Sequence, residues 1–181
     1  MRNLVKTFAS AALFVFLLAL PAGADDFKLG IGGGATFPAG NFANVYDPGW
    51  NITLRALWLP GSSVVGLRGA GYYGQNGARN GDFPGVGMDS AQLYGFDADL
   101  ALRLTGHGAE GLYAYLGGGV RALRQGVHAY GQKFSQTDTG ASGNAGLGWS
   151  AHRWFVEANA VYSGVQGTGL WSFPVTVGFQ F

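Results

Sequence analysis

The end of the chain, residues 170–181 (LWSFPVTVGFQF), constrains the fold more than any other stretch. Read back from the C-terminus in steps of two, it contains only large apolar residues: Phe181, Phe179, Val177, Val175, Phe173 and Trp171. The residues between them are polar or small, and strict alternation of this kind is typical of a β-strand with one apolar face. The stretch has the length of the roughly 9–11 residues that a tilted strand needs to cross a bilayer. It therefore predicts a transmembrane strand.

The start of the chain has the pattern of a secretory signal peptide. Arg2 and Lys6 precede an apolar run over residues 8–20, and small residues at Ala22 and Ala24 form a cleavage site. We expect residues 1–24 to be removed and residues 25–181 to form one domain. The chain has no cysteine, which excludes a lipoprotein anchor and disulfide bonds.

The composition is unlike that of an ordinary soluble domain. Charged residues make up only 12 % of the chain, aromatic residues make up 14 %, and 33 of the 181 residues are glycine. No basic cluster is present and the formal net charge is +1, so the sequence does not favour a nucleic-acid partner. After the signal peptide no apolar run approaches 18 residues, which excludes a helical membrane protein.

Alternation recurs along the whole mature chain. Besides the last strand, the pattern predicts seven more: 27–37, 50–59, 64–73, 93–104, 112–124, 140–150 and 154–162. The expected connections alternate in length, with long ones at 38–49, 74–92, 125–139 and 164–169, and short ones at 60–63, 105–111 and 151–153. This is typical of an all-β, eight-stranded antiparallel up-and-down transmembrane β-barrel, with short periplasmic turns, long outer loops and both chain ends in the periplasm.

The fifth predicted strand is the least regular. Tyr113 and Tyr115 share a parity with Arg121, whereas Val120 lies on the other parity. We expect a β-bulge within residues 117–119 that would turn both tyrosines and Val120 toward lipid.

The tryptophans are placed near the expected strand ends, on the lipid-facing parity. Trp58, Trp149 and Trp154 fall at periplasmic ends, whereas Trp50 and Trp171 fall at outer ends. The pattern predicts two aromatic girdles at the membrane interfaces. A soluble eight-stranded barrel would instead hide its large apolar residues inside.

Charged residues on the opposite parity predict a polar network in the lumen. Its members are Lys28, Arg55, Arg68, Asp97, Asp99, Arg103, Arg121 and Glu157. The interior of an eight-stranded barrel is just wide enough to be filled by side chains, so these charges must pair or hold water. Three interpretations stay open: a polar plug that ties the strands together, a narrow ion path, or a site for a bound polar ligand. No cofactor and no metal ion is expected.

An enzyme acting on lipid A is a further alternative. Such an enzyme needs a histidine within hydrogen-bond reach of a serine and oriented by an acid. The candidates His107, His128 and His152 all fall in predicted turns or loops. The sequence therefore favours a protein without enzymatic activity.

The chain resembles the small outer-membrane β-barrel proteins of the OmpA/OmpX-like type. The resemblance rests on the glycine-rich first strand, the Phe-Pro-x-Gly run at 37–40 and the C-terminal strand. Gly178, Phe179 and the terminal Phe181 are similar to the signal that the outer-membrane assembly machinery recognises.

This resemblance implies a monomer in the outer membrane, in contact with its lipids and lipopolysaccharide. The family includes envelope proteins, adhesins, small pores and occasional lipid enzymes. We expect a barrel that stabilises the envelope or presents residues 74–92 and 125–139 as a binding surface, since variable function concentrates in loops.

Overall fold

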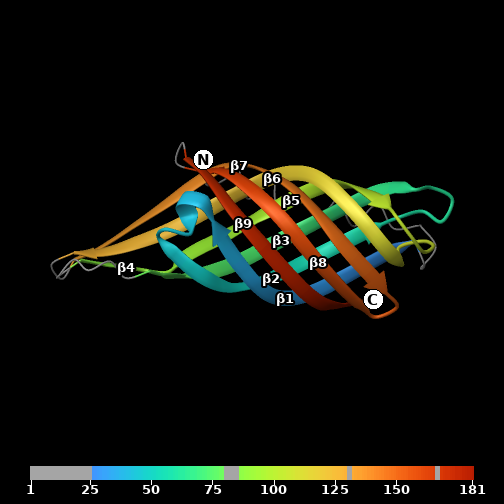
Figure 1. The fold of residues 1–181 in the computed structure, drawn as a ribbon, viewed down its shortest axis with the longest axis horizontal. Coiled ribbons are helices and arrows are strands. Elements are labelled where there is room, and N and C mark those ends of the chain that lie inside the picture. Colours follow the sequence, from blue (N-terminus) through green and yellow to red (C-terminus); the bar gives the residue numbers. More distant parts are fainter. Residues whose placement is uncertain (1–25, 80–85, 130–131, 166–167) are drawn as a thin grey trace, which may run out of the picture.

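The protein is a closed antiparallel β-barrel of eight long strands (Figure 1). The computed structural model describes residues 26–79, 86–129, 132–165 and 168–181. Seven pairings join strands that follow one another around the barrel, and the first strand closes the barrel against the last. The long strands are β1 (Phe27–Ala39), β2 (Tyr46–Trp58), β3 (Val65–Ala78), β5 (Ala91–Arg103), β6 (Gly111–Ala129), β7 (Gln132–Ala151), β8 (Trp154–Val165) and β9 (Thr168–Gln180).

Two short elements accompany the barrel. The strand β4 (Val86–Met88) pairs with the far end of β6, and the 3-10 turn η1 (Gly40–Phe42) connects β1 to β2. Both lie at what we call the loop end of the barrel. The opposite end, which we call the terminal end, contains Phe27, Phe181 and the tight connections between strands.

The C-terminal strand closes the barrel. β9 pairs with β1 from Gly30 opposite Gln180 to Ala39 opposite Trp171. The ladder continues through Phe181, whose amide donates to Leu29 O at 2.8 Å and whose carbonyl accepts from Leu29 N at 3.0 Å. The last residue of the chain is therefore part of the seam.

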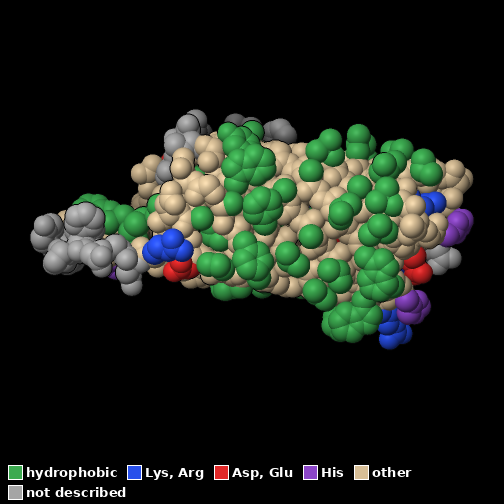
Figure 2. Space-filling model, in the orientation of Figure 1, with side chains coloured by type: hydrophobic (Ala, Val, Ile, Leu, Met, Phe, Trp, Pro, Cys, Tyr) green, Lys and Arg blue, Asp and Glu red, His purple; other side chains and the backbone are tan. Residues whose placement is uncertain are grey.

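Alternation along each strand separates an apolar outside from a largely polar inside. Leu100 and Leu116 are 63 % and 67 % exposed, whereas Thr53 and Arg55 are buried in the lumen. Figure 2 shows hydrophobic side chains over the waist of the visible face, with charged groups gathered toward the two ends. The barrel is thus reversed relative to a soluble one, as the sequence predicts. In the part of the chain that the structure describes, no helix has the length and hydropathy to cross a membrane.

The predicted strand cores are confirmed, but two predicted long loops are largely wrong. β3 continues to Ala78 and β5 begins at Ala91, while β6 and β7 continue as one hairpin to Ala129 and Gln132. This hairpin extends well past the barrel, with β4 beside it (Figure 1). The side chains of 132–137 are exposed, so the hairpin is held by backbone pairing and needs no alternation of apolar residues.

Candidate functional site

Six buried charges occupy the middle of the lumen. They are Arg55, Arg68, Asp97, Asp99, Arg121 and Glu157, so three cations face three carboxylates. The strands β2, β3, β5, β6 and β8 each bring at least one of them inward because their positions share the lumen parity. We call this group the central network.

Glu157 is the hub of one half of the central network. Its Oε1 accepts from Arg55 Nη1 at 3.1 Å and from Arg68 Nε at 3.0 Å. Its Oε2 accepts from Arg68 Nη2 at 2.6 Å, and the Tyr113 hydroxyl donates to Oε1 at 2.6 Å. Arg68 also bonds Asp99 through Nη1. The Glu157 carboxylate on β8 thereby connects the strands β2, β3 and β6 across the lumen. Such cross-strand bonds are what a polar plug requires.

The other half is centred on Asp97. Arg121 bonds its Oδ2 through Nη2, and the Ser142 hydroxyl donates to its Oδ1 at 3.2 Å. Arg121 is only 2 % exposed. Fully desolvated pairs of this kind are costly to break, because removing one partner leaves the other charge buried and alone.

Each buried arginine also lies over an aromatic ring. The guanidinium carbon of Arg55 is 3.8 Å from the Phe155 centroid, that of Arg68 is 4.1 Å from Tyr115, and that of Arg121 is 4.4 Å from Tyr72. Cation–π contacts strengthen when they are desolvated, as here. The aromatic rings therefore contribute to the network as well as filling space.

Glycines on neighbouring strands make room for these rings. An added Cβ at Gly30 or Gly32 would lie 2.8 Å from the Phe155 ring, and one at Gly178 would also meet it. Glycines on the lumen face of β1 therefore let Phe155 reach across β9 and under Arg55. This explains the glycine-rich first strand by close approach.

The expected bulge in β6 is wrong. β6 pairs in unbroken register with both neighbours, and Tyr113 and Tyr115 are buried in the lumen. Their rings lie against Gly148 and Gly146 of β7, where a Cβ would overlap them. Space on the neighbouring strand, together with the bonds of Tyr113 to Glu157 and Arg55, therefore outweighs the preference of tyrosine for an interface.

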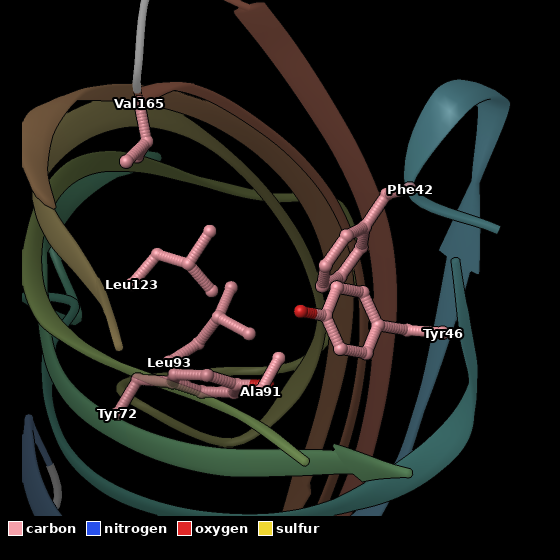
Figure 3. Close-up of a cluster of buried hydrophobic side chains, with 7 residues drawn as sticks. All are labelled: Phe42, Tyr46, Tyr72, Ala91, Leu93, Leu123 and Val165. Carbon is pink, nitrogen blue, oxygen red and sulfur yellow. The ribbon is translucent and has the colours of Figure 1, made fainter. Parts of the chain in front are cut away.

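Apolar clusters flank the central network on both sides. At the loop end the cluster is Phe42, Tyr46, Tyr72, Ala91, Leu93, Leu123 and Val165 (Figure 3). Toward the terminal end it is Leu57, Leu59, Ala101, Ala109, Tyr113 and Tyr115. We call these the loop-end seal and the terminal-end seal. Alternation alone did not reveal them, since it identifies which side a residue faces but not its neighbours.

The remaining two predicted lumen charges lie outside the central network. Lys28 faces Glu110 at 3.6 Å, and Arg103 donates to the carbonyls of Leu59 and Gly61 at 3.1 and 3.3 Å. Both therefore stabilise the connections at the terminal end.

The predicted interface residues lie on the outer surface. All five tryptophans are exposed, with Trp58, Trp149 and Trp154 toward the terminal end and Trp50 and Trp171 toward the loop end. Several contact a second aromatic ring: the ring centroids of Trp154 and Phe179 are 3.8 Å apart, and those of Trp171 and Tyr162 are 5.2 Å apart. The predicted cleavage residues Ala22 and Ala24 lie outside the described residues.

Asp89 joins β4 to the extended hairpin. Its carboxylate lies 2.6 Å from His128 Nε2 and 2.9 Å from Lys133 Nζ, and its amide donates to Gly126 O at 2.8 Å. The hydrogen bond from Lys133, supported by that with His128, lowers the pKa of Asp89 from its ordinary value of 3.8. The residues of β4 thereby become a third strand of a sheet above the barrel.

The other side of this hairpin is open. β7 pairs with β6 as far as Gln132, but its pairing with β8 begins only at Ser142. Among the described residues, no strand pairs with this side of residues 132–137, and Phe134 is 59 % exposed. Such an edge presents unused backbone donors and acceptors. We call residues 132–137 the β7 edge.

The three histidines are separated from one another. His128 pairs with Asp89 on the hairpin, whereas His107 and His152 lie in connections at the terminal end. Among the described residues, no hydrogen bond links any of them to a serine. No group of three metal-binding side chains occurs in these parts of the chain either.

The fold defines the class of small eight-stranded β-barrels found among outer-membrane proteins. No sequence family and no curated protein sequence matches the chain. Solved structures do match. The attachment invasion locus protein Ail of Yersinia pestis matches at a TM-score of 0.58 and 17 % identity, over 86 % of this chain and 96 % of Ail.

Two further structures are similar. The N-terminal β-barrel domain of Pseudomonas aeruginosa OprF gives a TM-score of 0.59 at 18 % identity, covering 86 % of this chain and 98 % of that domain. Neisserial surface protein A gives 0.51 at 17 % identity, covering 88 % and 98 %. Ail has also been solved with the heparin analogue sucrose octasulfate. At these identities the likeness concerns the fold.

Proposed function

We propose that this chain is a monomeric, non-enzymatic outer-membrane barrel that binds a partner through the sheet at its loop end. The observation that carries the proposal is the β7 edge, a strand edge that no described strand pairs with and that β6, β4 and Asp89 hold above the barrel. Its likeness in fold to Ail, an attachment protein, supports an adhesive role.

Membrane residence is supported by the outer surface. Apolar side chains cover the waist (Figure 2). The tryptophans lie toward both ends of the barrel, as headgroup regions favour. On this proposal the terminal end faces the periplasm and the loop end faces outward. Lipids and lipopolysaccharide then surround the barrel.

A closed lumen supports a binding role over conduction. The two seals contain seven and six buried residues, and the central network between them is paired. A continuous ion path would have to pass both apolar clusters. The narrow pore is therefore the weaker candidate.

The chemistry of the loop end favours a peptide partner over a sulfated polymer. Its described charges are balanced, with Arg79, Arg124 and Lys133 against Asp47, Asp89 and Asp138. Arg79 and Lys133 are already paired with Asp47 and Asp89. Addition of an extended strand needs only backbone groups on both sides, so we expect an extended peptide segment to bind.

A second copy of this chain in the same membrane is a poor partner for the β7 edge. Two copies related by an axis along the membrane normal would bring their edges together in parallel, and a parallel pair is not symmetric in its hydrogen bonds. A segment from another protein has no such restriction.

Binding of bacteria that carry the protein to cultured epithelial cells, to immobilised matrix protein and to heparin tests the proposal. A Ser135→Pro variant should lose binding to cells and matrix, because proline blocks a strand edge. Ser135→Thr keeps the backbone donor and should bind normally. Unchanged binding by Ser135→Pro, and by a variant with a short turn in place of 125–136, would leave envelope stabilisation as the role. Binding to heparin alone would overturn the peptide assignment.

A further inference from the structure

Among the residues whose buried polar side-chain atoms have no hydrogen-bond partner, three lie around a single cavity in the lumen. They are the Tyr115 hydroxyl, Nε and Nη1 of Arg121, and Oδ1 of Asn159, none of which has a hydrogen-bond partner among the described residues. Tyr115 and Arg121 are only 3 % and 2 % exposed. Buried polar groups without partners are costly, so their convergence needs an explanation.

All three residues line one internal cavity. Its volume is about 20 Å³, which suits about one water molecule. Arg68 and Glu157 from one half of the central network line it, together with Asp97 from the other half. The cavity therefore lies between two clusters of ion pairs that no hydrogen bond joins directly within the described part of the chain.

The polar atoms around the cavity determine which kind of molecule can bind in it. The unpaired atoms offer donors from Arg121 and Tyr115 and an acceptor from Asn159, so the guest must both accept and donate. The carboxylates of Asp97 and Glu157 also line the cavity and would repel an anion. A cation would face the two arginines.

We propose that this cavity binds a single water molecule that links Arg121 of the central network to Tyr115 and Asn159. The water accepts from Arg121 and Tyr115 and donates to Asn159. These bonds tie β6 to β8, and through the ion pair of Arg121 with Asp97 they extend to β5. Tyr72 of the loop-end seal and Tyr115 of the terminal-end seal both line this cavity.

Two tyrosine variants separate a bound water from an unfilled cavity. Tyr115→Phe removes a hydroxyl that donates to the water but keeps the ring against Arg68 and Gly146. We expect the unfolding equilibrium constant in urea to rise about tenfold, as for loss of a buried hydrogen bond. Tyr46→Phe is the matched control, because its hydroxyl is also buried and unpaired but lies in the loop-end seal and away from the cavity.

Tyr46→Phe should leave stability unchanged or raise it, since it removes an unsatisfied hydroxyl from apolar surroundings. If Tyr115→Phe behaves in the same way, the water assignment is overturned. A crystal structure that resolves ordered water should show one density peak within hydrogen-bond distance of Arg121, Tyr115 and Asn159. An anomalous peak there after growth in sodium bromide would instead identify an anion site and overturn the proposal.

Discussion

At the scale of single residues, the interior is organised by aromatic rings that fit against glycines. Phe155 fits against Gly30, Gly32 and Gly178, while Tyr113 and Tyr115 fit against glycines of β7. The rings in turn support the buried arginines. A glycine in this lumen is therefore a packing partner of a particular ring on the next strand.

Gly148→Ala should destabilise the barrel by about 1–3 kcal/mol, the usual cost of overpacking. The new methyl group would overlap the Tyr113 ring, which is fixed by Glu157 and Arg55. Urea unfolding of the refolded protein measures the change. Gly143→Ala is the control on the same strand, since its Cβ meets nothing nearer than Gly117 O at 4.0 Å. Equal losses in the two variants would contradict this packing.

Glu157→Gln should cost about 3–5 kcal/mol, because Arg55 and Arg68 would keep buried charge without their shared carboxylate. Asp47→Asn breaks an exposed ion pair with Arg79 and should cost less than about 1 kcal/mol. Urea unfolding of both variants gives the comparison. A loss at Glu157 no larger than that at Asp47 would show that the central network does not stabilise the barrel.

At the scale of elements, the sequence predicted the strands where one face meets apolar surroundings and failed where neither face does. The middle of β5 and the part of β9 from Leu170 onward follow from alternation alone. The β6–β7 hairpin beyond the barrel does not, because its residues 132–137 are exposed and carry no period. The prediction of a bulge in β6 was wrong for another reason. The space for Tyr113 and Tyr115 is made by glycines on β7, and the sequence of β6 alone does not show that space.

The C-terminal strand should also act in assembly. Phe181→Ser keeps the two backbone bonds to Leu29 but removes the terminal aromatic ring. We expect lower levels of the variant in the outer membrane, with unchanged refolding in detergent. Quantitative blotting of membrane fractions, with Phe173→Ser on the same face as control, makes the measurement. Normal levels of Phe181→Ser would argue against the assembly signal.

At the scale of the whole molecule, the barrel has three layers along its axis. A charged middle lies between two apolar seals, and the outer surface is apolar around the waist. The tight terminal end and the extended loop end differ strongly (Figure 1). This polarity fits a protein that is closed to ions and exposes one end for binding.

The depth of each outer residue should determine its tolerance to charge. Leu100→Arg, near the middle of β5, should cost about 2–4 kcal/mol, whereas Leu104→Arg, just beyond the end of that strand, should cost about 0–1 kcal/mol. Unfolding in lipid vesicles is the measurement. Equal costs at the two positions would mean that the waist does not contact the hydrocarbon core.

Single-channel recording of refolded protein comprising residues 25–181 in a planar bilayer tests the closed barrel most directly. The seals and the paired central network predict no conductance steps once a gel-shift assay has confirmed folding. Discrete steps that change with Asp97→Asn or Arg121→Gln would contradict this account and make the central network the lining of a pore.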